Sequence, residues 1–285
     1  MIVVTAATGQ LGQLVVDGLL RTVPADQIAV AVRNPDKAAG FTARGVAVRT
    51  ADYDDPASLR TAFAGAEKIL FISGAGVPER GDQHLRVVEA IKQVGTGQLA
   101  YTSVLRADTS TLLVAPDHKL TEQAIRDAGI PFTFLRNGWY LENFAPRIAA
   151  AVRTGTFAGN ATPAATVSSA NRIDYAEAAV AVLTGDGHLN KVYELAGDVA
   201  WSFPELAAEL AKQTGQPISY QQLSAAEHEK LLVDGGLPAG FAAFTVHTDQ
   251  GITEGELADA SGDLHRLIDR PTTSLADGVA AILLS

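Results

Sequence analysis

The stretch MIVVTAATGQLG, residues 1–12, joins a short apolar run to a glycine-rich turn. Glycines stand at Gly9 and Gly12, and Ala6 occupies the position where a third glycine is expected. Such a turn between a strand and a helix brings backbone N–H groups and the helix N-terminus close to a pyrophosphate. We therefore expect a dinucleotide-binding turn made of Ala6, Ala7, Thr8, Gly9, Gln10, Leu11 and Gly12, although an ordinary strand–helix turn is the alternative.

Ala6 adds one methyl group at the position where glycine is expected. The alanine is tolerable if its backbone keeps a negative φ and costly if φ is positive, because only glycine adopts positive φ without strain.

Short apolar runs alternate with helical patterns along the first half of the chain. Buried strands are expected over residues 1–5, 27–32, 45–50, 68–73, 98–103 and 131–137, because these runs are apolar without alternation. Between them, Leu11, Val15 and Leu19 share one helical face, and Asp55 with Pro56 is typical of a helix start. The alternation predicts an α/β fold, a Rossmann-type doubly wound parallel sheet.

The pattern changes after about residue 150. One more helix and strand, within residues 174–197, are expected to return to the sheet. Further on, Ser202 with Glu205 and Ser224 with Glu227 have the spacing of capping boxes. We predict an NAD(P)-binding Rossmann domain over residues 1–150 and a smaller, helix-rich C-terminal substrate or cap domain over residues 151–285.

Composition excludes several classes of function. The chain of 285 residues has a net charge of −10, which argues against binding to DNA or to an anionic membrane. It has no cysteine, which excludes disulfides, thiol nucleophiles and thiolate zinc sites. No basic leader or long apolar run is found, so we expect a cytoplasmic protein, monomer or homodimer, without a nucleic-acid or membrane partner.

The end of the second expected strand bears on the choice of nucleotide. The sequence AVRNPDKA, residues 31–38, places Arg33 where NAD-dependent enzymes carry an acidic residue. Arginine holds a 2′-phosphate through paired, charge-assisted bonds, so NADPH is the expected cofactor, with a solvated arginine as the alternative. Asp52 lies where a carboxylate meets the adenine amino group, and Ser73–Gly76 should pass beside the cofactor through Ser73 and Gly74.

The chain lacks the Tyr-x-x-x-Lys pair with which short-chain dehydrogenases protonate an alkoxide, since no lysine has a tyrosine four residues upstream. The helix expected in its place carries His118 and Glu122, four residues apart on one face. These two side chains form either a proton relay or a local structural hydrogen bond, and they are too sparse for a metal site. The absence of this proton donor favours an acceptor whose reduced form does not need a strong general acid. A quinone is such an acceptor, because its reduction gives a weakly basic hydroquinone anion.

FLRNGWYLENF, residues 134–144, follows the sixth expected strand and is rich in aromatic and amide side chains. Asn137, Gly138, Trp139, Tyr140 and Asn143 would offer a flat wall and hydrogen-bond donors to a planar acceptor at the carboxyl edge of the sheet. The alternative is a capped junction with a core tryptophan. Further on, Arg172 would either reach a cofactor phosphate or pair with a carboxylate.

The motifs ATGQLG, AVRNP, ADYDD, AYTSVLRADTS, LRNGWYLEN, DYAEAA and KVYELAGDVAW together resemble the NmrA-like branch of the atypical short-chain dehydrogenases. Within that branch the resemblance is strongest to bacterial NADPH-dependent quinone reductases, and triphenylmethane reductases are close. The resemblance implies an active cleft between two domains, NADPH as the direct hydride donor, no flavin, and quinone substrates. Ala6 departs from the glycine of these relatives.

The same resemblance implies the site residues. Asn143 matches a position beside the substrate, and we take Asn143, Tyr140 and His118 as candidate catalytic residues. The implied cofactor contacts are Thr8–Gly12, Arg33, Ser73, Gly74, Asn137, Gly138, Trp139, Tyr140, Leu141, Glu142 and Arg172. Two other functions stay open: reduction of another conjugated acceptor, such as a dye or an enone, and non-catalytic sensing of NADP(H), as in NmrA.

Overall fold

The computed structural model describes residues 1–74 and 79–284. Ala75 and Gly76, which belong to the segment expected beside the cofactor, lie outside the described residues.

Internal contacts divide the chain into two compact units. Unit 1 comprises residues 1–108, 116–137 and 173–193, and unit 2 comprises residues 109–115, 138–172 and 194–285. Each unit is therefore built from three separate stretches of chain. The second unit includes residues 109–115, and its next stretch begins at Gly138, directly after a strand, whereas the sequence suggested a boundary near residue 150.

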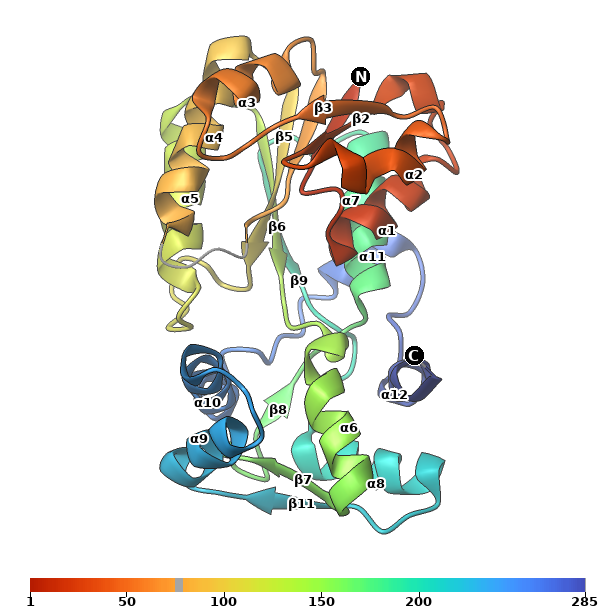
Figure 1. The fold of residues 1–285 in the computed structure, drawn as a ribbon, viewed down its shortest axis with the longest axis vertical. Coiled ribbons are helices and arrows are strands. Elements are labelled where there is room, and N and C mark those ends of the chain that lie inside the picture. Colours follow the sequence, from red (N-terminus) through yellow and green to blue (C-terminus); the bar gives the residue numbers. More distant parts are fainter. Residues whose placement is uncertain (75–78, 285) are drawn as a thin grey trace. The chain divides into compact units, whose positions relative to one another are not determined.

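A seven-stranded sheet has the order β3-β2-β1-β4-β5-β6-β9 (Figure 1). The pairs from β3 to β6 are parallel, and β9 continues the sheet through bonds from Asn190 to Phe132 and from Gly138 to Leu195. The strand order reverses between β1 and β4, as in doubly wound folds. The strands are β1 (Ile2–Thr5), β2 (Ile28–Val32), β3 (Ala47–Thr50), β4 (Lys68–Phe71), β5 (Gln98–Val104), β6 (Phe132–Asn137) and β9 (Lys191–Leu195).

The predicted strands are confirmed as strands, but the one expected to be buried over residues 45–50, observed as β3, is not buried, because it lies at the edge of the sheet. For the buried strands the reason for their continuous apolarity is visible. Every residue of β1, β2 and β5 is buried, whereas the edge strand β3 is largely accessible. Strands covered by helices on both faces have no exposed face that would favour polar residues.

Helices cover both faces of the sheet (Figure 1). α3 (Pro56–Phe63), α4 (Arg80–Val94) and α5 (Ala115–Asp127) pack one face, where a core cluster includes Phe63, Phe71, Tyr101 and Phe134. The other face carries α1 (Gln10–Leu19), α2 (Ala39–Thr42) and α7 (Arg172–Thr184). Burying one large apolar side chain contributes roughly 1.5–3 kcal/mol, so the two layers of core residues stabilise the sheet.

The local signals read from the sequence hold at several helix ends. Asp55 caps α3 by accepting the Ala57 N–H, and Pro56 stands at the first helical position. Leu11, Val15 and Leu19 of α1 are buried, as predicted for its apolar face. Short 3₁₀ turns connect other elements: η1 (Ala25–Gln27), η2 (Pro35–Ala38) and η3 (Leu141–Phe144).

Unit 2 combines two small sheets with helices. β7 (Thr156–Gly159) pairs in parallel with β11 (Ser219–Gln222), and β8 (Thr166–Val167) pairs antiparallel with β10 (Trp201–Ser202). Both predicted capping boxes are present, at the starts of α8 and α9. The helices are α6 (Ala145–Thr154), α8 (Phe203–Thr214), α9 (Ala225–Asp234), α10 (Ala239–Thr253), α11 (Asp263–Ile268) and α12 (Leu275–Leu284).

A buried ion pair links two helices of unit 2, and three further elements pack aromatic rings on it. The Arg147 guanidinium of α6 donates to both carboxylate oxygens of Asp249 in α10, at 2.8 and 3.0 Å. Its carbon lies 4.6 to 5.7 Å from the ring centroids of Phe144, Phe157 and Phe203. Paired hydrogen bonds and aromatic faces compensate the desolvation of this charge.

Across the part of the chain that the structure describes, no helix combines the length and the apolar composition that crossing a bilayer requires.

Candidate functional site

The turn between β1 and α1 has the form expected of a phosphate-binding loop. The Gly9 N–H donates to the Ala6 carbonyl at 2.9 Å, and α1 begins at Gln10 without a side-chain cap on its N-terminus. A Cβ at position 12 would lie 2.6 Å from the Ala7 Cα, so only glycine allows the helix to pack this closely on the strand. The first N–H groups of α1 are thereby left for a ligand.

Ala6 adopts φ of 47°, in the left-handed region. The sequence left open whether φ of Ala6 is negative or positive, and the structure has the positive φ, which costs free energy in alanine. An alanine in this region is strained by about 1–2 kcal/mol relative to its right-handed conformation, whereas glycine is not.

Arg33 follows the last residue of β2 and is exposed. Among the residues that the structure describes, its guanidinium has no hydrogen bond or ion pair. Most of the other arginines of unit 1 are engaged, for example Arg44 with Asp17 and Arg86 with Asp54. An uncommitted guanidinium at the end of the second strand is available to an anionic ligand.

Asp52 lies after β3 and is half-buried. Its Oδ1 accepts the Asp54 N–H at 3.1 Å, which orients the carboxylate at the carboxyl edge of the sheet. Ser73 and Gly74 lie at the same edge, after β4, and their N–H groups donate to Thr102 and His84.

His118 and Glu122 do not bind each other; each has partners on other elements. The His118 Nδ1 lies 2.8 Å from the Tyr101 hydroxyl, and burial lowers the pKa of His118 to about 3. Glu122 accepts from Ser103 at 2.7 Å and from the Arg136 guanidinium at 2.9 and 2.7 Å. His118 is 5% exposed, so the expected relay has no direct path to a ligand, and its catalytic role stays a prediction.

A second group of side chains lies in unit 2, around the start of α7. The Glu142 carboxylate accepts the Arg172 backbone N–H through both oxygens, at 2.9 and 3.1 Å, and so caps the helix. The Arg172 guanidinium lies 4.9 Å from the Tyr140 ring centroid and 3.9 Å from Glu142. Of the two possibilities for Arg172, the pairing with a carboxylate is present, while the phosphate contact stays a prediction.

Arg172 also orients Asn143. Its Nη2 donates to the Asn143 Oδ1 at 3.4 Å. A guanidinium has donors only, so the atom of Asn143 that faces it is the amide oxygen, and the Nδ2 group remains as a donor. Asn143 is thus prepared to donate a hydrogen bond.

Trp139 is only partly buried, so it is not a core tryptophan. Its ring centroid lies 6.2 Å from that of Phe244 in α10, with an interplanar angle of 31°. The two rings form an aromatic surface within unit 2 next to the Tyr140–Asn143 segment. Asn137, by contrast, is buried at the end of β6.

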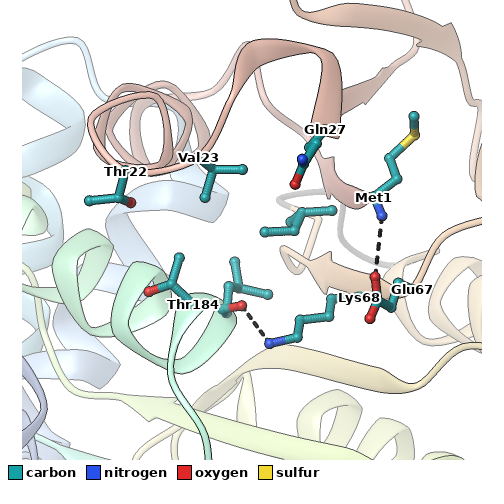
Figure 2. A pocket seen from close by; sticks show the side chains of 9 residues that line it. Met1, Thr22, Val23, Gln27, Glu67, Lys68 and Thr184 are labelled. Atoms are coloured by element: carbon teal, nitrogen blue, oxygen red, sulfur yellow. Dashed lines mark hydrogen bonds and ion pairs between the residues drawn. The ribbon is translucent and has the colours of Figure 1, made fainter.

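A cavity of about 400 Å³ lies at the opposite, amino-terminal edge of the sheet (Figure 2). Its charged groups are engaged, since the Met1 ammonium lies 3.5 Å from Glu67 and the Lys68 Nζ donates to the Leu183 carbonyl at 2.7 Å. Ligands of doubly wound sheets bind at the carboxyl edge, so this cavity is not the candidate site.

Sequence reasoning missed four residues that shape the carboxyl edge: Thr5, Tyr53, His84 and Thr102. Thr5 and Thr102 place a hydroxyl near the ends of otherwise apolar strands. A hydroxyl at such a position was a signal that the side chain forms a hydrogen bond at this edge of the sheet. His84 and Tyr53 gave no local signal, because their partners are distant in the chain.

Over the described residues no group of three or more histidine, aspartate or glutamate side chains has the arrangement of a metal site.

The model of the NmrA-like family matches residues 1–260. The chain belongs to the NmrA-like family. The protein named quinone oxidoreductase 2 of Escherichia coli (strain K12) is 48% identical over 280 residues, 98% of each chain. The family assignment made from the sequence motifs is thereby confirmed.

Two solved structures agree with this fold. The NADPH complex of the NADPH-dependent quinone oxidoreductase of Escherichia coli has a TM-score of 0.97 and 48% identity, covering 99% of this chain and 100% of that one. The NADP(H) complex of the triphenylmethane reductase of Citrobacter sp. has a TM-score of 0.96 and 40% identity, with the same coverage. The Rossmann-type fold predicted from the sequence is confirmed.

Proposed function

We propose that this protein reduces quinones with NADPH, by direct hydride transfer and without a flavin. The observation that carries the proposal is the glycine turn at the switch point of the sheet, which opens onto an uncapped helix, together with Arg33 directly after β2, whose guanidinium has no partner among the described residues. Its similarity to the quinone oxidoreductase of Escherichia coli, 48% identical and crystallised with NADPH, supports the same assignment.

The residues present fit NADPH. Gly9 would permit close approach of the pyrophosphate to the start of α1, whose N–H groups and dipole favour negative charge, and Gly12 lets the helix pack closely on the turn. Arg33 is placed to hold the 2′-phosphate, which distinguishes NADPH from NADH. Asp52, Ser73 and Gly74 complete the proposed contacts of unit 1. In unit 2 the proposed contacts are Gly138, Trp139, Tyr140, Leu141, Glu142 and Arg172, and Asn137 precedes them.

When bound, NADPH supplies a hydride to the quinone, and the product takes up one proton from solvent to become the hydroquinone. The work left to the protein is to orient the acceptor and to stabilise the negative charge that develops on its oxygen. Asn143 suits that role, because Arg172 holds its oxygen and leaves its Nδ2 as a donor. Trp139 and Phe244 offer flat apolar faces to an aromatic acceptor.

A second candidate acceptor is a triarylmethane dye, which the similarity to the triphenylmethane reductase of Citrobacter sp. favours. Both acceptors are conjugated, and the reduction of neither passes through an alkoxide that would require a strong acid.

Oxidation of NADPH, followed by its absorbance, tests these proposals with benzoquinone, with a triphenylmethane dye and without acceptor. We expect the fastest turnover with benzoquinone. Tight binding of NADPH with no turnover of either acceptor would instead indicate a sensor, and no binding would contradict the proposal as a whole. We propose a monomer or homodimer, which light scattering of the purified protein tests.

A further inference from the structure

Three consecutive backbone amides after β4 are held by side chains instead of by a neighbouring strand. The Ile72 N–H donates to the Thr5 Oγ1 at 3.0 Å, and the Ser73 N–H donates to the Thr102 Oγ1 at 2.9 Å. The Gly74 N–H donates to the Nε2 of His84 at 3.2 Å. The three acceptors come from β1, β5 and α4, so the segment is fixed from three elements of unit 1.

The carbonyl side of the segment is held as well. The Tyr53 hydroxyl lies 3.1 Å from the Ile72 carbonyl and 2.7 Å from the Thr5 Oγ1. Thr5 and His84 are both fully buried. These bonds hold the segment in position, because a displacement would break them and leave the buried Ile72 N–H without its acceptor.

This segment lies at the place where ligands bind in doubly wound folds. β4 is the neighbour of β1 across the point where the strand order reverses, and Ile72–Gly74 continue β4 at its carboxyl end. The phosphate turn continues β1 at the same edge.

His84 is suited to hold Gly74 only in one protonation and tautomeric state. To accept the Gly74 N–H, Nε2 must be unprotonated, so the ring proton is on Nδ1. That Nδ1 lies 2.9 Å from the Thr121 hydroxyl, which donates to the Asp117 carbonyl at 2.6 Å. The chain of bonds runs in one direction, from Gly74 through the imidazole to the backbone of α5.

The surroundings of His84 keep this state. Burial lowers the pKa of His84 to about 4, with a further contribution from the Arg80 charge, so the ring is neutral at pH 7. The edge of the imidazole packs on Phe71, whose centroid is 4.9 Å away. The ring is thus neutral, oriented and fixed.

We propose that His84 is a positioning residue for NADPH: by accepting the Gly74 N–H it sets the position of the Ser73–Gly74 backbone that the cofactor contacts. The inference rests on the proposed function, since it requires that this segment binds NADPH. His84 itself touches neither the cofactor nor the substrate in this proposal.

Two amide variants separate the two ring nitrogens. The amide oxygen of His84→Gln reaches the place of Nε2 and can still accept the Gly74 N–H. The amide of His84→Asn reaches only the place of Nδ1 and retains the Thr121 side alone. We expect His84→Asn to raise the Kd for NADPH about tenfold, the effect of one lost hydrogen bond, and His84→Gln to raise it less than about threefold.

His228→Asn is the matched control. His228 is also a buried histidine, but it bonds to Asn160 and lies 3.5 Å from Asp249, both in unit 2, and it has no bond to the Ile72–Gly74 segment of unit 1 among the described residues. The Kd is measured by titration of NADPH fluorescence without an acceptor, alongside thermal unfolding of each variant. All three variants lose thermal stability, but only His84→Asn loses affinity. Equal affinities for the two His84 variants, or an equal loss in His228→Asn, would overturn the inference.

Hydrogen exchange of the parent protein gives a second test that needs no variant. The Gly74 amide, although outside any strand, should exchange at least about tenfold more slowly than an unprotected amide. An unprotected Gly74 amide would overturn the proposal. A parent protein that does not bind NADPH would contradict the proposed function, whereas normal binding with no effect of His84→Asn contradicts only the role of His84.

Discussion

Ala6 carries strain that its neighbours impose on it. Its φ of 47° lets its carbonyl accept the Gly9 N–H and close the phosphate turn. We predict that Ala6→Gly raises the free energy of unfolding by about 1 kcal/mol, because glycine adopts this conformation without the clash of a Cβ. This value is the relief of strain minus the cost of the greater conformational entropy that glycine gives the unfolded chain. Urea denaturation of the protein without ligand measures the difference.

Ala7→Gly is the control for that measurement, since Ala7 is fully buried and is not among the residues with positive φ. This substitution should lower stability by about 1 kcal/mol. If Ala6→Gly were also less stable than the parent, the strain assigned to Ala6 would be absent.

Arg33 decides the preference for NADPH over NADH in our proposal. Replacing it with glutamate puts a negative charge beside the 2′-phosphate, so Arg33→Glu should raise the KM for NADPH at least about tenfold and change that for NADH far less. Steady-state kinetics with both nucleotides measures the two constants. Arg60→Glu makes the same change of charge at an exposed position of α3 and should affect neither constant. Equal effects of Arg33→Glu on both nucleotides would contradict the assignment.

Asn143 is proposed to stabilise charge on the substrate oxygen through its Nδ2 group. Asn143→Asp retains the shape and the oxygen that faces Arg172 but removes the donor. We expect kcat/KM for benzoquinone to fall about 10- to 100-fold while the Kd for NADPH changes less than about threefold. Asn190→Asp introduces the same charge in a turn outside the candidate site and serves as the control. Unchanged quinone kinetics in Asn143→Asp would remove Asn143 from the mechanism.

At the scale of secondary-structure elements, the contact of α1 with β1 depends on a single glycine. A methyl group at position 12 would lie 2.6 Å from the Ala7 Cα, and backbone cannot yield as a side chain does. Gly12→Ala should therefore lower the free energy of unfolding by about 1–3 kcal/mol and weaken NADPH binding, because α1 is displaced from the turn.

Gly40 in α2 provides the comparison, since a Cβ there meets nothing within 4 Å. Gly40→Ala should raise stability by about 0.5–1 kcal/mol, as expected for alanine in a helix. Thermal unfolding of the two variants with and without NADPH measures both effects. A Gly12→Ala variant as stable as the parent would show that the helix has room to shift.

What the sequence predicted well are features set by neighbours along the chain. The cap at Asp55 and the capping boxes at Ser202 and Ser224 depend on residues two or three positions apart, and all three are present. The buried strands follow from their composition. The parallel, doubly wound sheet followed from strand–helix alternation, because crossover connections allow few alternatives.

What the sequence did not predict depends on partners brought together by folding. Thr5 lies 67 residues before Ile72, and Glu142 lies 30 residues before Arg172. His118 and Glu122 have the spacing of an interacting pair on a helix, yet β5 offers each a better partner, Tyr101 and Ser103. A helical spacing indicates which side chains share a face, but not what the face packs against.

At the scale of the whole molecule, three buried neutral histidines make stability depend on pH. Burial lowers the pKa of His84, His118 and His228 to about 4, 3 and 4. The unfolded chain binds protons at these residues below about pH 6.5, whereas the folded protein does not until about pH 4. Stability is therefore fully present above pH 7 and falls as the pH drops from 6.5 towards 4.

We predict a loss of about 1 kcal/mol per histidine between pH 7.5 and pH 5.5, roughly 3–4 kcal/mol in total. Urea denaturation at a series of pH values measures it. Hydrogen bonds lower the pKa of the Asp108 and Glu205 carboxyl groups. These groups therefore change the free energy of unfolding only at a more acid pH. Replacing His228 with asparagine should reduce the slope by about a third, and a stability that is constant from pH 7.5 to 5.5 would contradict the neutral state of these residues.

The chain crosses from one unit to the other at residues 108–109, 115–116, 137–138, 172–173 and 193–194. No single cut of the polypeptide can therefore release either unit intact. A fragment that stops at residue 137 would lack α7, against which Gly18 of α1 packs, and also the outermost strand β9, leaving β6 with an unpaired edge. A C-terminal truncation that begins at or before residue 193 therefore removes parts of both units, so variants of either unit have to be made in the full-length chain.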